Sequence, residues 1–390
     1  MSNVRIDLNP DLKRLWDEGY DLEVTPEGYL LVKNVPYVNE QKEVKKDGVL
    51  VTLLSLNNDS TVKPANHEAF FAGGKPCYSS GIPIHVIIGS GKQLTTTLIG
   101  LHHLSAKDDY NDYYEKVTRY ISIITNQAKA IDDTVSAQTY MFFEQDPEVE
   151  SVFNYIDTNS SRAEISPITQ KLAGLKIGII GLGGTGSYIL DFVAKTPVQE
   201  IHLFDSDNFL QHNAFRAPGA IKRERFNEHL KKVNYFSEIY SAMHRNIVPH
   251  PYNVSSENTN ELQNLNFVFI SMDSGPQKND IITFLESNKI PFIDCGLGME
   301  NIDNSLKSQL RITSSSDFKN DHVRKYVSFA KPEDDLYDKN IQIADLNCLN
   351  ALMAIIKWKK IYGFYHDLDK EHHCTYVSFT NEFTNSEVPD

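Results

Sequence analysis

Short apolar runs separated by turn-forming residues dominate the first third of the chain. Four such runs are strand candidates, because each is bounded by clusters of Asn, Asp, Gly and Pro: residues 29–33, 49–55, 83–88 and 94–99. The spacing then changes to that of a helix over residues 108–131. The apolar side chains of that helix repeat at i, i+3, i+4 and i+7: Val117, Tyr120, Ile121 and Ile124. Residues 1–140 are therefore predicted to form a separate α+β domain.

The second half of the chain alternates buried-type strands with helices. The strand candidates are residues 176–180, 201–204, 267–272 and 291–295, and the longest helix candidates are residues 224–245 and 344–362. This alternation is typical of a doubly wound, mostly parallel sheet with helices on both faces. We expect residues 305–313 to leave the parallel pattern as an antiparallel edge strand. Residues 165–390 are thus predicted to form one α/β domain, joined to the first by a polar linker at residues 141–164.

A glycine-rich turn joins the first strand of this domain to its first helix. The glycines are Gly181, Gly183, Gly184 and Gly186. Glycine allows the sharp turn and lets a phosphate approach the backbone, while the free N–H groups of the helix N-terminus attract an anion. Ser187 adds a hydroxyl donor, and Asp205 ends the next strand 19 residues after Gly186, near the ~20 of a ribose-binding acid. The stretch predicts a nucleotide site in a Rossmann-like fold.

The loop after Asp205 restricts which reactions a nucleotide site at this turn could catalyse. A glycine turn alone also fits nicotinamide-dependent enzymes. Here Asp207, Asn213 and Arg216 follow within 11 residues. Cationic groups at this place suit an enzyme that breaks the α–β phosphate bond of ATP, because that reaction develops charge on the departing pyrophosphate.

Four ordered motifs resemble those of the ThiF/HesA/MoeB family, the adenylating core related to ubiquitin-activating enzymes. They are GLGGTGS at 181–187, LFDSD at 203–207, NAFR at 213–216 and SMDSGPQKN at 271–279. The likeness covers about residues 160–362 and implies a ThiF/MoeB-like doubly wound fold. Residues 1–140 are an additional module that the family core does not explain.

The resemblance implies a role for each matching position. The four glycines and Ser187 would hold the ATP phosphates, and Asp205, with Asp207 beside it, would bind the nucleotide at the ribose. Asn213, Arg216 and Lys232 would contact the phosphates, with Lys231 as a close rival to Lys232. Asp273 would hold Mg²⁺. Arg162 is the candidate for the arginine that the family donates across its dimer interface.

The resemblance also implies an activity and partners. The expected reaction is ATP-dependent adenylation of the C-terminal glycine carboxylate of a ubiquitin-like or sulphur-carrier protein, by a homodimer that acts with a downstream conjugation enzyme. Residues 1–140 would serve partner docking or conjugation. Three alternatives remain open: adenylation of a small-molecule or tRNA carboxylate, a non-catalytic nucleotide-binding interaction protein, and a nicotinamide enzyme.

Composition restricts these interpretations further. The net charge is −14 and no dense run of Lys or Arg occurs, which argues against nucleic-acid binding. No 18-residue apolar run and no signal-peptide core is present, so we expect a cytoplasmic protein with no membrane partner. The histidine pairs, His102–His103 and His372–His373, are expected to have surface or structural roles.

The four cysteines do not form a CxxC pair, so no zinc site is predicted. Cys295 and Cys348 fall in buried patterns, where a thiol is inert. Cys77, in a Gly/Pro loop expected to be exposed, and Cys374 remain the candidates for a thioester carrier.

Overall fold

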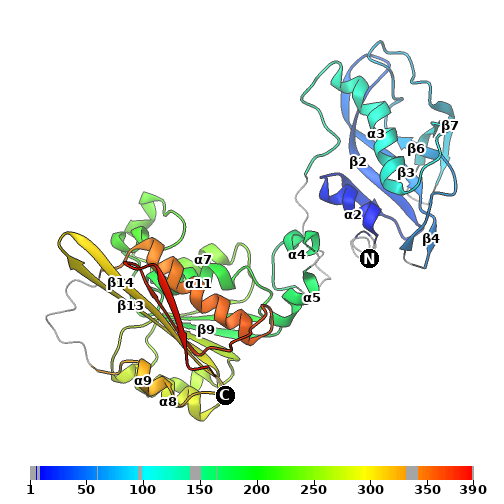
Figure 1. The fold of residues 1–390 in the computed structure, drawn as a ribbon. Helices are drawn as coiled ribbons and strands as arrows, with labels where there is room; N and C mark the ends of the chain where they lie inside the picture. The colour runs from blue at the N-terminus through cyan, green and yellow to red at the C-terminus, as the bar shows by residue number, and fades with distance from the viewer. Residues whose placement is uncertain are drawn as a thin grey trace. The chain divides into compact units, whose positions relative to one another are not determined.

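The computed structural model describes residues 6, 9–58, 60–94, 99–140, 151–163, 165–330 and 341–388, apart from the side chains of residues 92, 161 and 162. The chain divides into two compact units, Met1–Phe143 and Glu144–Asp390. Each unit is described by itself (Figure 1). Within the described residues, no helix is both long and apolar enough to cross a lipid bilayer.

The first unit is an antiparallel sheet with helices packed on it, which confirms the separate α+β domain. Its described strands pair in the order β1-β2-β3-β6-β8-β7. Their bounds are Asp21–Val24, Tyr29–Val38, Val44–Leu53, Glu68–Ala72, Ile99–Ser105 and Ile87–Gln93 in that order, and β4 (Leu56–Asn57) pairs with β5 (Ser60–Thr61). Helix α2 spans Pro10–Asp17, and α3 spans Tyr113–Lys129.

Helix α3 covers one face of this sheet. Asp112 caps its start by accepting a hydrogen bond from the Glu115 N–H. The apolar stripe predicted from the helical spacing is the buried one, and it shares a core with Leu30, Val32 and Phe71 of the strands. The strand predicted at residues 83–88 is placed wrongly, because β7 begins only at Ile87. Four residues of the strand predicted at 94–99, residues 95–98, lie outside the described part of the chain.

The second unit is built on one mixed sheet in the order β11-β10-β9-β12-β13-β14-β15-β16. The first five are parallel neighbours and the last three are antiparallel. Their bounds in that order are Ile247–His250, Glu200–Phe204, Lys176–Ile180, Phe267–Ile270, Phe292–Ile302, Ser305–Ser315, His373–Val377 and Glu382–Ser386. Strand β14 is antiparallel, as predicted, but it is not the edge, because β15 and β16 pair beyond it.

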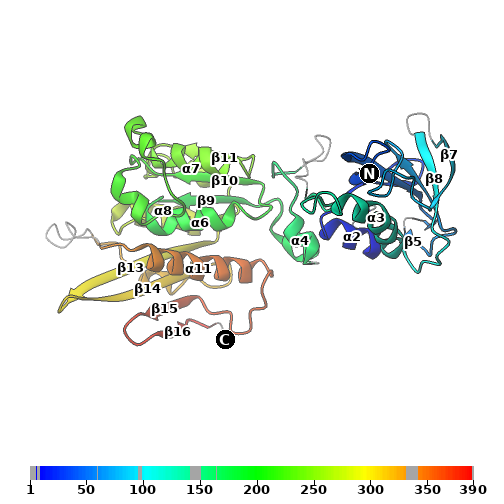
Figure 2. The ribbon, with the colours of Figure 1, turned by 90° about the horizontal axis from the view of Figure 1, so that it is seen from above.

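Helices cover both faces of this sheet, as the doubly wound prediction required. Helices α6 (Gly184–Val193), α7 (Lys232–Tyr240) and α11 (Ala344–Ile361) pack on one face, with α11 over β13 and β14 (Figure 2). Helices α8 (Pro276–Ser287) and α9 (Val323–Tyr326) pack on the other face.

Short helical turns complete the second unit. Their bounds are α4 Thr158–Arg162, α5 Ser166–Thr169, η1 Gln170–Leu172, η2 Gln211–Phe215, η3 Arg223–Glu228 and η4 Thr259–Leu262. The helix predicted at residues 224–245 is therefore divided into η3 and α7. His229 takes a left-handed backbone conformation (φ 50°) between them, which a continuous right-handed helix cannot include.

Candidate functional site

The glycine turn connects β9 to α6 at the carboxyl end of the parallel strands. Gly181 has φ +87°, and a Cβ there would lie 2.6 Å from the Ser271 carbonyl oxygen, so only glycine fits without strain. A Cβ on Gly186 would overlap the Gly181 carbonyl. At Gly183 the N-terminus of α6 has no side-chain cap and no neighbour within 4 Å of a Cβ position, and such a helix end offers free N–H groups to an anion.

Two polar residues fix this turn from inside. Ser187 is fully buried and its hydroxyl donates to the Gly184 carbonyl (2.8 Å), so the hydroxyl supports the turn itself. The buried Asp205 carboxylate accepts hydrogen bonds from the Leu182 N–H (2.7 Å) and the Asp207 N–H (2.8 Å). Asp205 therefore ties the end of β10 to the start of the turn.

The two adjacent lysines have different environments. Lys232 is buried, and its Nζ lies 2.7 Å from Asp207 and 3.5 Å from Asp205. The Nζ of Lys231 donates to the Ser206 carbonyl at 2.7 Å. Lys232 thus faces the carboxylates beside the glycine turn, whereas Lys231 holds the backbone of the loop after β10.

Asn213 belongs to the short η2 turn that follows β10, and Arg216 directly follows this turn. Asn213 is buried, and its Oδ1 accepts a hydrogen bond from the Leu210 N–H (2.8 Å), which shapes the turn. Arg216 is half-buried, and burial lowers the pKa of its guanidinium while the charges of Asp273 and Asp207 act in the opposite direction. Its Nε has no hydrogen-bond partner among the described residues. Arg216 is therefore a cation with unused donor capacity under the electrostatic influence of two carboxylates.

Asp273 follows strand β12 and is exposed. It lines a cavity of about 380 Å³ together with Gly183, Gly184 and Thr185 of the glycine turn. The Arg162 side chain lies outside the described residues, although its backbone ends α4. Among the described side chains, no group of three or more His, Cys, Asp or Glu residues is placed to hold a metal ion.

Two cations that line this cavity, and the buried acid that pairs with both, were not predicted from the sequence. The Asp294 carboxylate of β13 is fully buried and pairs with Lys278 of α8 and Arg311 of β14, each at 2.8 Å. Both cations line the cavity. A signal was present in the sequence, because an acid inside the apolar run PFIDC at 291–295 needs a buried cationic partner.

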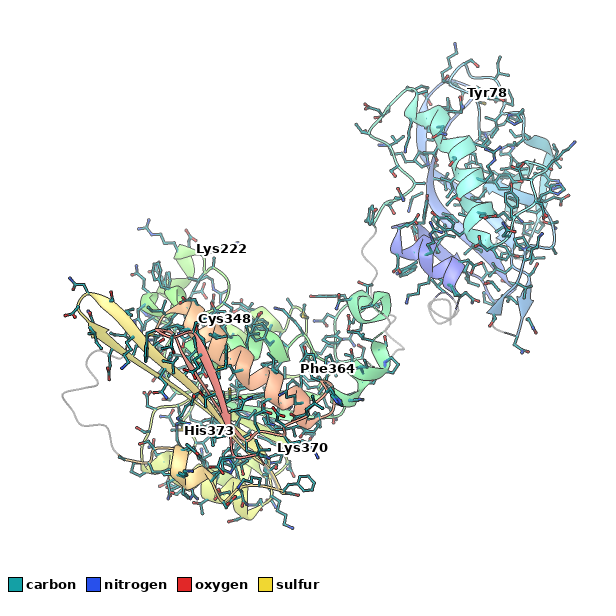
Figure 3. All side chains as sticks on the ribbon, viewed as in Figure 1. Tyr78, Lys222, Cys348, Phe364, Lys370 and His373 are labelled. Atoms are coloured by element: carbon teal, nitrogen blue, oxygen red, sulfur yellow. The ribbon has the colours of Figure 1, made fainter. Side chains whose placement is uncertain are left out.

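None of the four thiols is in an environment that would activate it. Cys77 is buried, contrary to the exposed position expected for it, because its backbone bridges to Val38 and Pro83. Burial raises the pKa of Cys77 and Cys295, and raises that of Cys374 to about 11. The pKa of Cys348, which projects from α11 (Figure 3), is raised as well. All four therefore favour the protonated, weakly nucleophilic thiol at neutral pH.

Comparison with solved structures finds similar chains at low identity. E. coli MccB with MccA-N7isoASN is 15% identical, with 60% of this chain and 72% of that chain covered and a TM-score of 0.48. PaaA is 14% identical, with 70% and 85% covered and a TM-score of 0.46. E. coli tRNA N6-threonylcarbamoyladenosine dehydratase, TcdA, is 20% identical, with 36% and 64% covered and a TM-score of 0.32.

Comparison with curated proteins finds no match. Family models match two segments of the chain. Residues 10–158 match a Domain of unknown function (DUF6791). Residues 157–302 match the ThiF family, and this segment contains β9 to β13, the glycine turn, Asp205, Arg216 and Asp273. The chain therefore carries a ThiF family domain at residues 157–302, preceded by a separate module.

Proposed function

We propose that the second unit uses ATP to adenylate a carboxylate and releases pyrophosphate. The observation that carries the proposal is the half-buried Arg216, whose guanidinium is under the electrostatic influence of Asp273 and Asp207, in a domain with a ThiF-type glycine turn. A carboxylate is already ionised at neutral pH, so the attack on the α-phosphate needs no general base. One carboxylate oxygen forms a bond to the α-phosphorus, and the bond to the pyrophosphate oxygen breaks. The protein therefore contributes by aligning the carboxylate with the α-phosphate and by neutralising the charge on the departing pyrophosphate.

The roles of individual residues follow from their positions. The N-terminus of α6 at Gly183 and Gly184 would bind phosphate, and Asp205 would bind the ribose. Arg216 and Lys232 would neutralise charge as pyrophosphate departs. Asp273 fits Mg²⁺, since this ion is commonly held by one or two carboxylates together with substrate phosphates, and the ion would supply further charge neutralisation.

The finer proposal concerns the carboxylate. We propose that it is the C-terminal glycine of a ubiquitin-like or sulphur-carrier protein, and that residues 1–140 dock this protein or a conjugation enzyme, in a homodimer. The raised thiol pKa values favour a reaction that ends at the acyl adenylate rather than at a thioester on this chain.

The test is ATP–pyrophosphate exchange by the full chain, with Mg²⁺, after addition of three fractions of a cell extract: proteins, RNA and small molecules. We expect the protein fraction alone to support exchange. Asp273→Asn should reduce exchange about 10²-fold, whereas Asp280→Asn, on α8 and away from the cavity lining, should not. If no fraction supports exchange, adenylation is wrong. If only RNA or only small molecules support it, adenylation stands and the protein acceptor is wrong.

A further inference from the structure

Two histidines contact each other on neighbouring strands of the second unit. His202 lies on β10 and His250 ends the adjacent β11 (Figure 2). The Nδ1 of His202 is 3.0 Å from the Nε2 of His250, and each side chain is less than a fifth exposed. Such a contact needs one proton between the two nitrogens, because a bare imidazole nitrogen can only accept a hydrogen bond.

The histidine pair is the middle of a chain of polar contacts. At one end, the Nε2 of His202 lies 3.0 Å from the Glu200 carboxylate. At the other end, the Nδ1 of His250 lies 2.8 Å from the hydroxyl of Tyr252, and this hydroxyl donates to Glu261 of η4. An ionised carboxylate, which can only accept, therefore closes the chain at each end.

The groups around the pair fix the protons at both ends of this chain. Lys176 of β9 lies 2.8 Å from Glu200, and the hydrogen bonds from Lys176 and His202 lower the pKa of Glu200, which keeps it ionised. Burial, together with the hydrogen bond to Glu261, raises the pKa of Tyr252 to about 12, so its hydroxyl keeps its proton. The charged and titratable groups that face the pair in the described part of the chain are thus Lys176, Glu200, Tyr252 and Glu261.

The chain is complete only when the histidine pair carries one extra proton. Its four contacts, from Glu200 to Glu261, need one proton each. The Tyr252 hydroxyl supplies one proton, and two neutral imidazoles supply two more. The fourth contact is made only if His202 and His250 together hold a third proton. Without it, two acceptors face each other and one hydrogen bond is lost.

His250 is joined to the nucleotide site through the end of β10. Its ring lies parallel to that of Phe204, with centroids 4.3 Å apart, and its backbone carbonyl accepts a hydrogen bond from the Asp205 N–H at 3.3 Å. The Asp205 carboxylate in turn accepts from the Leu182 N–H of the glycine turn. A shift of His250 would therefore move the backbone that carries Asp205.

We propose that His250 is a positioning residue for Asp205, and that a proton bound by the His202–His250 pair holds the end of β10 in the arrangement that binds ATP. The inference rests on the proposed role of Asp205 at the ribose. Protonation of the pair should strengthen ATP binding, and by linkage ATP should strengthen proton binding. Burial and His202 lower the pKa of His250 while Glu261 acts in the opposite direction, so the third proton should bind below the ordinary value of about 6.5.

The experiment measures the Kd of ATP with Mg²⁺ for the full chain at pH 5.5 and pH 7.5, and compares variants with the wild type at each pH. In Glu261→Gln the introduced amide can donate to Tyr252, whose hydroxyl then donates to His250. All four contacts are then made without the third proton. We expect this variant to bind ATP about fivefold more tightly than the wild type at pH 7.5, and equally at pH 5.5.

The matched control is Glu257→Gln, which removes one negative charge from an exposed position in the same loop. It should bind ATP like the wild type at both pH values. A second measurement needs no variant to fold: ¹⁵N spectra of the histidine-labelled wild type should show three protons on the His202–His250 pair at pH 5.5 and two at pH 7.5.

Three outcomes would overturn the inference and leave the proposed function intact. These are equal ATP affinity of the wild type and Glu261→Gln at pH 7.5, an equal advantage of Glu261→Gln at both pH values, and a pair that holds only two protons at pH 5.5. If the wild type binds no ATP at either pH, the proposed function itself is wrong.

Discussion

Lys232 and Asp205 form a buried ion pair directly beneath the glycine turn. The Nζ of Lys232 lies 3.5 Å from the Oδ2 of Asp205, and both side chains are less than a tenth exposed. The same Oδ2 accepts the hydrogen bond from the Leu182 N–H. The lysine therefore compensates the charge that holds the turn in place, so that one cation has both a structural role and the proposed role at the phosphates.

Removing this lysine should destabilise the second unit. In Lys232→Met, Asp205 would keep its buried charge without its cationic partner, and we expect a loss of about 1–3 kcal/mol in the free energy of unfolding. The measurement is urea unfolding at pH 7. Lys231→Met is the matched control, because the Lys231 side chain donates to the Ser206 carbonyl and compensates no buried carboxylate among the described residues, so its loss should be smaller. Equal losses in the two variants would contradict the assigned pairing.

Replacing Arg216 should lower activity without lowering stability. The guanidinium is half-buried and its Nε has no partner among the described residues, so the folded protein gains little from it. We expect Arg216→Met to leave the unfolding midpoint unchanged or raised, and to lower ATP–pyrophosphate exchange about 10²-fold. Arg223→Met, at an exposed position in η3, should change neither quantity. A variant that lost stability and activity together would indicate a structural arginine.

Most of the site residues that could be predicted from the sequence belong to short local patterns. The glycine turn, the acid at the end of β10 and the acid after β12 each depend on residues close together in the chain, and their positions follow from the parallel strand order. The Ser187 hydroxyl shows the limit of this reasoning. Its place in the first turn of α6 was evident, but its hydrogen bond to the Gly184 carbonyl depends on a backbone geometry that the sequence does not display.

The features that could not be predicted from the sequence depend mainly on pairing between residues far apart in the chain. Arg311 meets Asp294 because β14 runs antiparallel to β13 in one particular register, with Gly296 opposite Arg311. No local pattern links these positions. Strands β15 and β16 were missed because their side chains are mostly exposed or half-buried, which leaves no clear two-residue alternation.

Lys116 in the first unit should make stability depend on pH above neutrality. It is fully buried, its Nζ donates to the Asn66 carbonyl at 3.0 Å, and burial lowers its pKa to about 8. An unfolded lysine titrates near 10.4, so between about pH 8 and 10.4 the unfolded chain binds more protons than the folded one. Stability of this unit should therefore rise with pH in that window.

The check is proteolysis in urea at pH 7.5 and pH 9, scored by loss of the N-terminal fragment. The first unit of the wild type should resist proteolysis better at pH 9 than at pH 7.5. We expect Lys116→Met to be more resistant than wild type at pH 7.5, by about 1 kcal/mol, and to lose this part of the pH dependence. Lys129→Met, exposed at the end of the same helix α3, should behave as wild type. A Lys116 variant that unfolded more easily would mean that the hydrogen bond to the Asn66 carbonyl outweighs the cost of burying the lysine.

His373 joins the C-terminal strands to the rest of the second unit as a neutral buried group. It lies on β15 (Figure 3), its Nδ1 is 3.0 Å from the Thr313 hydroxyl, and its ring stacks on Tyr326 with centroids 3.8 Å apart. Burial, with the charge of Arg311 in addition, lowers its pKa to about 4. Burial also lowers the pKa of the adjacent His372 to about 4. The pair has the structural role expected from the sequence.

Acidification should therefore begin to destabilise the second unit at pH values above those at which carboxylates titrate. An unfolded histidine has a pKa near 6.5, so between about pH 6.5 and 4 the unfolded state binds more protons and stability falls as the pH falls. At pH 5 the loss from His373 alone is at most about 2 kcal/mol, from 1.36 kcal/mol per pH unit. The pKa of Glu387 is lowered to about 2, chiefly by Lys325, so its contribution is lost only at lower pH.

Urea unfolding at pH 7 and pH 5 measures this loss. The signal is the fluorescence of the buried Trp358 in a Trp16→Phe background, so that it reports on the second unit alone. His373→Gln should be less stable than the parent at pH 7, because Thr313 and Tyr326 lose their partner, but should lose less stability on going to pH 5. His366→Gln, at an exposed position, should keep the full pH dependence. If His373→Gln kept it as well, His373 would already be protonated in the folded protein, and the neutral buried state inferred from its contacts would be wrong.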